Sequence, residues 1–113
     1  MNIGRALLIL TGFIFLCFGS CIAQVEVLHF NSEWNDENNF DISELKECKT
    51  ETIIICDNPE LKEKHKIMSV PTIIIFDEGI EVKRFEANLM MKLTCTKKEI
   101  QKEIEKIILA KFE

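Results

Sequence analysis

Three cysteines carry the strongest potential for covalent chemistry in this 113-residue chain, beyond its first 23 residues. A cysteine thiolate can attack a disulfide, and a second thiol is then needed to resolve the mixed disulfide that forms. The three residues, Cys48, Cys56 and Cys95, include no Cys-x-x-Cys pair. Because their number is odd, at least one is free or pairs with another chain. The spacing therefore argues against a dithiol site and leaves single-thiol chemistry open.

The expected elements keep these thiols apart. Cys48 and Cys56 flank a β-branched run, Thr52–Cys56, which indicates a buried strand. The roughly seven or eight extended residues from Cys48 to Cys56 span more than about 20 Å, whereas a disulfide needs Cα atoms within about 7 Å, so we expect no bond between them. Cys95 directly precedes Thr96, the residue at which the last helix is expected to begin. The N-terminus of a helix favours the thiolate form of a nearby cysteine. We expect Cys56 to be a small core residue, with a single-thiol reaction at Cys56 or Cys95 as the alternative.

Hydrophobic patterning predicts three further strands. Val25–Asn31 is mostly apolar on both faces, and the unbroken apolar run Thr72–Phe76 is typical of a strand buried on both faces. Asp77-Glu78-Gly79 follows as a hairpin turn, because glycine tolerates the positive φ that a tight turn requires. Ile80–Glu86 then alternates loosely and completes the hairpin.

Capping signals predict three helices. A short helix is expected from Ser32 to about Cys48, and a second begins at Asn58-Pro59, a capping residue followed by proline at the first helical position. The last helix begins at the capping box Thr96–Glu99 and continues to Phe112 with isoleucines at helical spacing. The segment from Asn88 to Cys95 matches no element. The apolar contacts expected of the first helix are Phe40, Ile42 and Leu45.

The first 23 residues have the layout of an export signal. Arg5 is their only charged side chain, an apolar run follows it, and Cys21 and Ala23 occupy the small-residue positions of a cleavage site. Cleavage would leave residues 24–113 as one small domain in the periplasm, outside the cell or in an endomembrane lumen. An uncleaved membrane anchor is the alternative, because the apolar run up to Ala23 is just long enough to span a bilayer.

Charge excludes one class of partner. The chain carries a formal charge of −5, and without Arg5 the remaining 13 basic and 19 acidic residues give −6. No basic stripe is present to replace the counterions of a nucleic acid, so we expect no nucleic-acid partner.

His29, Asp36 and Glu37 are residue types that bind metal ions, but they do not show the repeated spacing of metal ligands. We therefore expect neither a metal site nor a cofactor.

The stretch Ile67–Glu86 resembles the C-terminal half of a thioredoxin. In that family a Val/Ile-Pro-Thr sequence with a cis proline opens a buried strand, followed by a glycine turn, an edge strand and a final helix. Val70-Pro71, the apolar run, Gly79 and the last helix follow in the same order here. The resemblance covers Val25 to Phe112. It implies a thioredoxin-like α/β fold, in which a four-stranded mixed sheet is flanked by about three helices. Across the sheet, the second strand in the sequence lies at one edge, followed by the first, the third and the fourth. The strand and helix with which the family usually begins have no counterpart in this resemblance.

The resemblance also locates the family's redox site. Thioredoxins have Asp-Phe-Trp-Ala-Glu-Trp before Cys-Gly-Pro-Cys, whereas this chain has His29-Phe30-Asn31-Ser32-Glu33-Trp34 before Asn35-Asp36-Glu37-Asn38. Asparagines replace both cysteines, and an amide cannot exchange disulfides. We expect Asn35 and Asp36 to cap the following helix instead. His29 replaces the family's buried aspartate, and we expect a packed strand residue with one hydrogen bond, although a histidine there could titrate near neutral pH.

These observations favour an exported, non-catalytic module that binds a peptide or protein. The resemblance implies that the binding groove is formed by Trp34, by the loop Asn35-Asp36-Glu37-Asn38 and by Val70-Pro71, where the family docks extended peptides. The alternative is a thiol-disulfide oxidoreductase that works through Cys56 or Cys95. A purely structural role is a third reading, and the oligomeric state is open.

Overall fold

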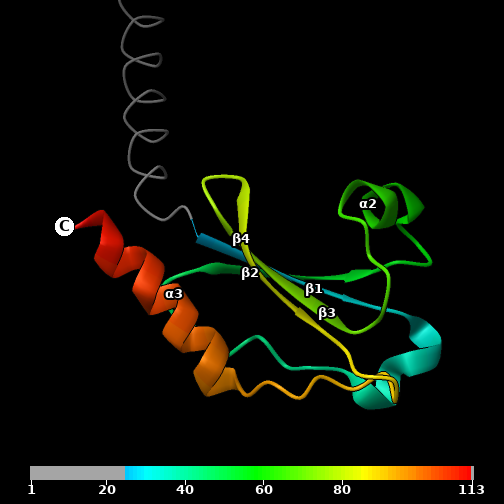
Figure 1. The fold of residues 1–113 in the computed structure, drawn as a ribbon. Helices are drawn as coiled ribbons and strands as arrows, with labels where there is room; N and C mark the ends of the chain where they lie inside the picture. Colours follow the sequence, from blue (N-terminus) through cyan, green and yellow to red (C-terminus); the bar gives the residue numbers. More distant parts are fainter. Residues whose placement is uncertain (1–24, 113) are drawn as a thin grey trace, which may run out of the picture.

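The computed structural model describes residues 25–112, which form one mixed sheet with helices on both faces (Figure 1). The strand order is β2-β1-β3-β4, as the sequence predicts. The expected export signal lies outside the described residues. Within those residues, no helix is both long and apolar enough to cross a membrane.

Strands β1 (Val25–Asn31) and β3 (Thr72–Asp77) form the centre of the sheet. They pair antiparallel, and β3 continues into the antiparallel hairpin strand β4 (Ile80–Glu86) through a turn in which Gly79 has φ 81°. Five of the six residues of β3 are buried, as expected for a strand covered on both faces.

Alternation along the strands divides the core into two layers. One face of the sheet carries Val27, Ile73 and Ile75, which pack against helix α3 (Lys97–Lys111) through Ile100 and Ile104. The opposite face carries Phe30, Ile53, Ile74 and Phe76, which pack against the segment that follows helix α2 (Pro59–Lys64) through Ile67 and Val70. Because successive strand side chains point to opposite faces, each strand supplies both layers.

Helix α3 is held near one end by the irregular segment before β2 and at the other end by β3. Thr96 caps it as predicted, since its Oγ1 accepts a hydrogen bond from the backbone N–H of Glu99 at 3.2 Å. Near this end, Gln101 exchanges two hydrogen bonds with the backbone of Lys46, at 2.8 and 3.1 Å. At the other end, Lys111 forms an ion pair of 2.7 Å with Asp77 at the end of β3.

The predicted helix from Ser32 to Cys48 is wrong over most of its length. A 3-10 helix, η1, covers only Glu33–Asn38, and residues 39–48 are irregular. Local polar contacts compete with helix formation, because the Asp41 carboxylate accepts from both the N–H and the hydroxyl of Ser43. Ile42 and Leu45 are nevertheless buried under α3, so the irregular segment supplies the packing expected of a helix.

The second strand differs from the prediction in position and burial. Strand β2 is Lys49–Ile54 and pairs parallel with β1, from Glu26 opposite Lys49 to Asn31 opposite Ile54. Its first four residues are exposed because β2 is an edge strand, which the β-branched run alone does not reveal. Pairing with β1 draws the polar residues 49–51 into the strand and leaves Cys56 in the turn beyond it.

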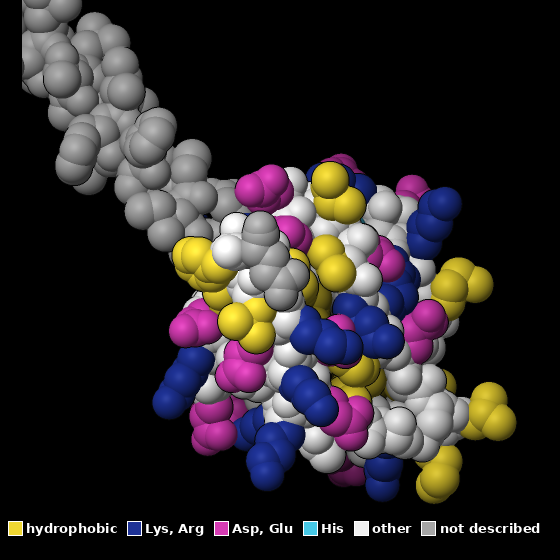
Figure 2. Space-filling view, turned by 60° about the vertical axis from the view of Figure 1, so that its left-hand side comes forward, with side chains coloured by type: hydrophobic (Ala, Val, Ile, Leu, Met, Phe, Trp, Pro, Cys, Tyr) yellow, Lys and Arg dark blue, Asp and Glu magenta, His cyan; other side chains and the backbone are white. Residues whose placement is uncertain are grey.

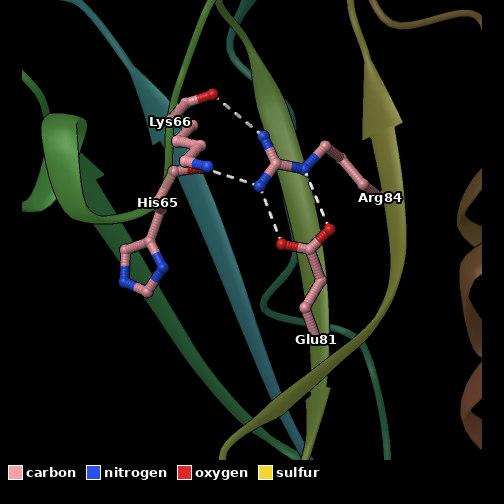
Figure 3. A network of polar contacts seen from close by, with 4 residues as sticks. All are labelled: His65, Lys66, Glu81 and Arg84. Carbon is pink, nitrogen blue, oxygen red and sulfur yellow. Dashed lines mark hydrogen bonds and ion pairs between the residues drawn. The ribbon is translucent and has the colours of Figure 1, made fainter.

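An arginine links the last strand to the end of α2 (Figure 3). The Arg84 guanidinium donates to the backbone carbonyls of His65 at 2.7 Å and Lys66 at 3.1 Å, and it forms a bidentate pair with Glu81. The carbonyls at the end of a helix lack intrahelical partners, and a cation is favourable there. The His65 ring in turn packs between Phe30 and Phe76, with ring centroids 5.4 and 5.3 Å apart. Arg84 thus fixes the segment that leads to Val70.

Candidate functional site

A groove of about 310 Å³ lies where η1, the segment before β3 and the loop after β4 meet. In Figure 1, η1 and the loop after β4 lie together, at the end of the sheet away from the β3–β4 turn. The lining is mostly apolar, with polar atoms from a lysine, a serine and an asparagine. The lining residues are Trp34, Ile55, Lys62, Ile67, Met68, Ser69, Val70, Asn88, Leu89 and Met91.

Large hydrophobic side chains around this groove are exposed to solvent. Trp34 is 64% exposed, Met68 is 86% exposed and Leu89 is fully exposed. Single exposed apolar residues are common on protein surfaces, but several around one hollow are typical of a binding surface. Trp34 and Val70, which the sequence assigns to a groove, do line this one together.

The loop after β4 is held in shape by Asn88. The side-chain oxygen of Asn88 accepts from the backbone N–H groups of Met90 at 2.9 Å and Lys92 at 3.1 Å. Met91 has a positive φ of 59°. This ordered turn, for which the sequence predicts no structure, presents Leu89 and Met91 to the groove.

Asn35 is buried and holds the walls of the groove together from inside. It is 5% exposed, and its Nδ2 lies 3.2 Å from Asn31 Oδ1, 3.3 Å from the Val70 carbonyl and 3.2 Å from the Met91 carbonyl. Its Oδ1 accepts from Asn38 Nδ2 at 2.8 Å. One amide thus joins β1, η1, the segment before β3 and the loop after β4.

We call Asn31, Asn35, Asn38 and Asn39 the asparagine cluster. Asn31 Nδ2 donates to the Asn35 carbonyl at 3.2 Å and to Asn39 Oδ1 at 2.9 Å, which completes the set. The expected cap is wrong, because the N-cap of η1 is Ser32, without a side-chain hydrogen bond, and Asn35 lies inside η1. The two asparagines at the cysteine positions are internal structural groups.

Of the other residues that the sequence assigns to the groove, only Val70 lines it. Asp36 and Glu37 are exposed on η1 and do not line the groove. The Val70–Pro71 peptide bond is cis, as the resemblance implies. Pro71 is fully buried, so Val70 is the residue of this pair that lines the groove.

His29 is a fully buried strand residue with two polar partners. The backbone N–H of Phe40 donates to Nε2 at 3.4 Å, and Nδ1 lies 3.3 Å from Thr52 Oγ1, which places the imidazole proton on Nδ1. Burial lowers the pKa of His29 from 6.5 to about 4, because the charged form is poorly solvated there. Titration near neutral pH, which the sequence permits, does not occur at this residue.

The three thiols are free and differ in accessibility. Cys56 is exposed, which corrects the expectation of a core residue. Cys48 and Cys95 are half-buried against the α3 side of the core. Burial and the Glu99 carboxylate raise the pKa of Cys95, so the expected thiolate character at the helix N-terminus is wrong, and burial also raises the pKa of Cys48. No three His, Cys, Asp or Glu side chains among residues 25–112 gather where they could hold a metal ion.

Sequence reasoning missed most of the groove. Met68 and Leu89 belong to segments without hydrophobic periodicity, and Lys62 lies on a short helix with no buried residue. The usable signal is the concentration of large apolar residues between Asn88 and Cys95, where no strand or helix requires them. Their contact with Trp34 depends on the hydrogen bond between Asn35 and Met91, which pattern analysis does not reveal.

No protein-family model matches the sequence, and no curated protein does. Solved thioredoxins match the structure. A mutant thioredoxin from Halobacterium salinarum is 16% identical with a TM-score of 0.59, over 77% of each chain. Thioredoxin 1 from Thermosipho africanus is 21% identical with a TM-score of 0.59, over 78% of this chain and 99% of that one. Thioredoxin-2 of a malaria parasite, described as a component of its protein secretion machinery, is 20% identical with a TM-score of 0.60, over 74% and 82%.

These likenesses establish the fold: the chain has a thioredoxin-like α/β fold, as the sequence predicts. Sequence identities of 16–21% do not indicate what activity the chain has.

Replacement of Asn35 by alanine should destabilise the protein by about 2–3 kcal/mol, because the partners of the buried amide would lose their hydrogen bonds. Urea unfolding measures this loss, and amide hydrogen exchange should show faster exchange in the loop 88–92. Asp36→Ala is the matched control, since Asp36 is adjacent and exposed. Equal stability of the Asn35 and Asp36 variants would contradict the structural role of Asn35.

The lowered pKa of His29 predicts a loss of stability in acid. Above pH 6.5 the residue is neutral in both states and contributes no pH dependence. Between pH 6.5 and about 4 the unfolded chain binds a proton that the folded chain does not, and the loss reaches about 3 kcal/mol. Urea unfolding at pH 7.5, 5.5 and 4.5 measures it, and His29→Gln should flatten the difference. Parallel pH profiles of the two proteins would contradict this assignment.

Proposed function

We propose that this protein is an exported thioredoxin-like module that binds an extended apolar segment of a partner protein and performs no dithiol exchange. The observation that carries the proposal is the groove, in which exposed Trp34, Met68 and Leu89 surround buried Val70. Export is proposed from the layout of the first 23 residues, with an uncleaved anchor as the alternative.

The size and lining of the groove favour a short peptide segment. A volume of about 310 Å³ is at the lower end of the range for ligand sites, which suits a few side chains better than a large cofactor. Burial of apolar surface drives such binding, and the few polar atoms at Lys62, Ser69 and Asn88 can orient the ligand backbone. Flexible methionine side chains adapt to ligands of different shape.

The surface charges provide no site for a nucleic acid on the face shown in Figure 2. Acidic and basic side chains are interspersed over that face, with hydrophobic side chains among them. A polyanion would need a continuous basic patch, and the formal charge of −5 opposes its approach. A protein segment with apolar side chains has no such requirement.

The arrangement of the thiols supports a binding function over disulfide exchange. Both positions of the family's dithiol are asparagines, and Asn35 already has hydrogen-bond partners on four segments. The exposed Cys56 follows the end of β2 and Cys48 precedes its start, so the length of the strand separates these two thiols. A mixed disulfide at Cys56 would therefore need an external thiol for its release.

Binding can be measured with Trp34, because it is the only tryptophan of the chain and lies on the groove. Peptides of eight residues with leucine, phenylalanine or methionine at the centre should shift or quench its fluorescence, whereas serine-substituted peptides should not. Leu89→Ser combined with Met68→Ser should weaken binding about tenfold, a loss of about 1.4 kcal/mol.

The control is Leu109→Ser on α3, which removes another exposed hydrophobic side chain, away from the groove. It should leave the affinity unchanged. An unchanged fluorescence signal over the whole apolar peptide set, or an equal loss in the Leu109 variant, would contradict the proposed groove.

The alternative of an oxidoreductase working through one thiol is favoured only by the exposure of Cys56. In the folded protein we expect rapid alkylation of Cys56 and slow alkylation of the half-buried Cys48 and Cys95, read by mass spectrometry. Insulin reduction with dithiothreitol should stay at the rate without protein. A rate above that background that disappears in Cys56→Ser would establish the alternative instead.

A further inference from the structure

We propose that the open edge of β2 is a homodimer contact, in which two copies of this chain pair their β2 strands antiparallel about a two-fold axis at Thr50. The pairing would extend two four-stranded sheets into one continuous sheet of both copies. This inference concerns a different face from the peptide groove and does not depend on it.

Among residues 25–112, the edge of β2 is open along most of its length. In this part of the chain β2 pairs with β1 alone, and its residues from Lys49 to Thr52 are all exposed. An edge strand presents unpaired backbone N–H and C=O groups in a row, and another strand can satisfy them. The alternating threonines Thr50 and Thr52 are strand-favouring residues that suit such pairing.

Both faces of the sheet are hollowed beside this edge. On the α3 face, a hollow of about 390 Å³ lies between residues 39–43 and residues 50–52. On the opposite face, a hollow of about 220 Å³ lies over Glu26, Leu28 and residues 49–51. Side chains of an added strand would point alternately into these two hollows, because strand side chains alternate between faces.

Charge complementarity selects a second copy as the occupant. With the two-fold axis at Thr50, Lys49 of each copy lies directly opposite Glu51 of the other, on the same face of the sheet. Residues opposite each other in an antiparallel pair stabilise it when their charges are opposite, and a Thr–Thr pair at the centre adds to this. Two identical Lys–Glu pairs therefore form from one short sequence, Lys49-Thr50-Glu51.

The other edge of the sheet is less suited to pairing. Strand β4 carries a register irregularity opposite Ile75 and Phe76, and a bulge of this kind twists an edge away from a partner strand. Its Arg84 and Glu81 also bind each other, at 2.7 Å. Strand β2 shows no such irregularity in its pairing with β1.

The contact is short, and we expect a weak dimer with a dissociation constant on the order of 0.1 mM, since interfaces of this size lie below the standard range. Sedimentation equilibrium of the purified protein, from about 10 µM to about 1 mM in roughly 0.15 M salt, measures it. Lys49→Glu and Glu51→Lys should each weaken self-association about tenfold, because each places like charges opposite one another.

Mixing the two variants tests the register itself. The Lys49→Glu chain has two glutamates at positions 49 and 51, and the Glu51→Lys chain has two lysines there, so the mixture should associate at least as strongly as the original protein. Lys102→Glu and Glu105→Lys are the controls, since both residues are exposed on α3 and the charge changes are the same. Neither control should change the dimer constant more than about twofold.

A protein that stays monomeric at about 1 mM would overturn the proposal, and in that case the edge remains open to an extended segment of another protein. Association that the Lys49 and Glu51 variants leave unchanged would also overturn it, because the dimer would then use another face. Failure of the variants to recombine on mixing would overturn the register at Thr50. None of these outcomes bears on peptide binding at Trp34, which is measured separately by fluorescence.

Discussion

The asparagine cluster is the interaction on which the candidate site depends. The side-chain amide of Asn35 links η1 to the Met91 carbonyl of the loop after β4 and to the Val70 carbonyl before β3. A buried amide is favourable only when its donors and acceptors are satisfied, and here each has a partner. Asn35 therefore serves as a junction between β1, η1, the segment before β3 and the loop after β4.

The sheet was predictable because its signals are local and strong. The apolar run of β3, the glycine of the following turn and the isoleucines of α3 each permit one structure, and together they leave few topologies. The cis bond before Pro71 followed from the resemblance. The strand order followed from the resemblance, and β2 lies at the edge of the described sheet.

The failures have a common physical cause: they concern segments whose structure depends on tertiary contacts. Residues 39–48 pack two apolar side chains under α3 without the periodicity of a helix, so pattern analysis overestimated their order. The boundaries of β2 are determined by its ladder with β1 and not by its own composition. The exposure of Cys56 follows from those boundaries. Burial of His29 could be inferred from its strand, but its low pKa required the packing around it.

Helix α2 has no buried residue, and its attachment to the molecule relies on the partly buried Leu61, the segment after it and the Arg84 guanidinium. Elements with so few apolar contacts open at lower free energy than a central strand such as β3. Lys62 and the exposed Met68 lie on one wall of the groove, whereas Asn35 joins the opposite wall to the sheet by hydrogen bonds. We therefore expect the side with Lys62 and Met68 to change its shape more readily than the side with Met91, at no cost to the packing of the sheet.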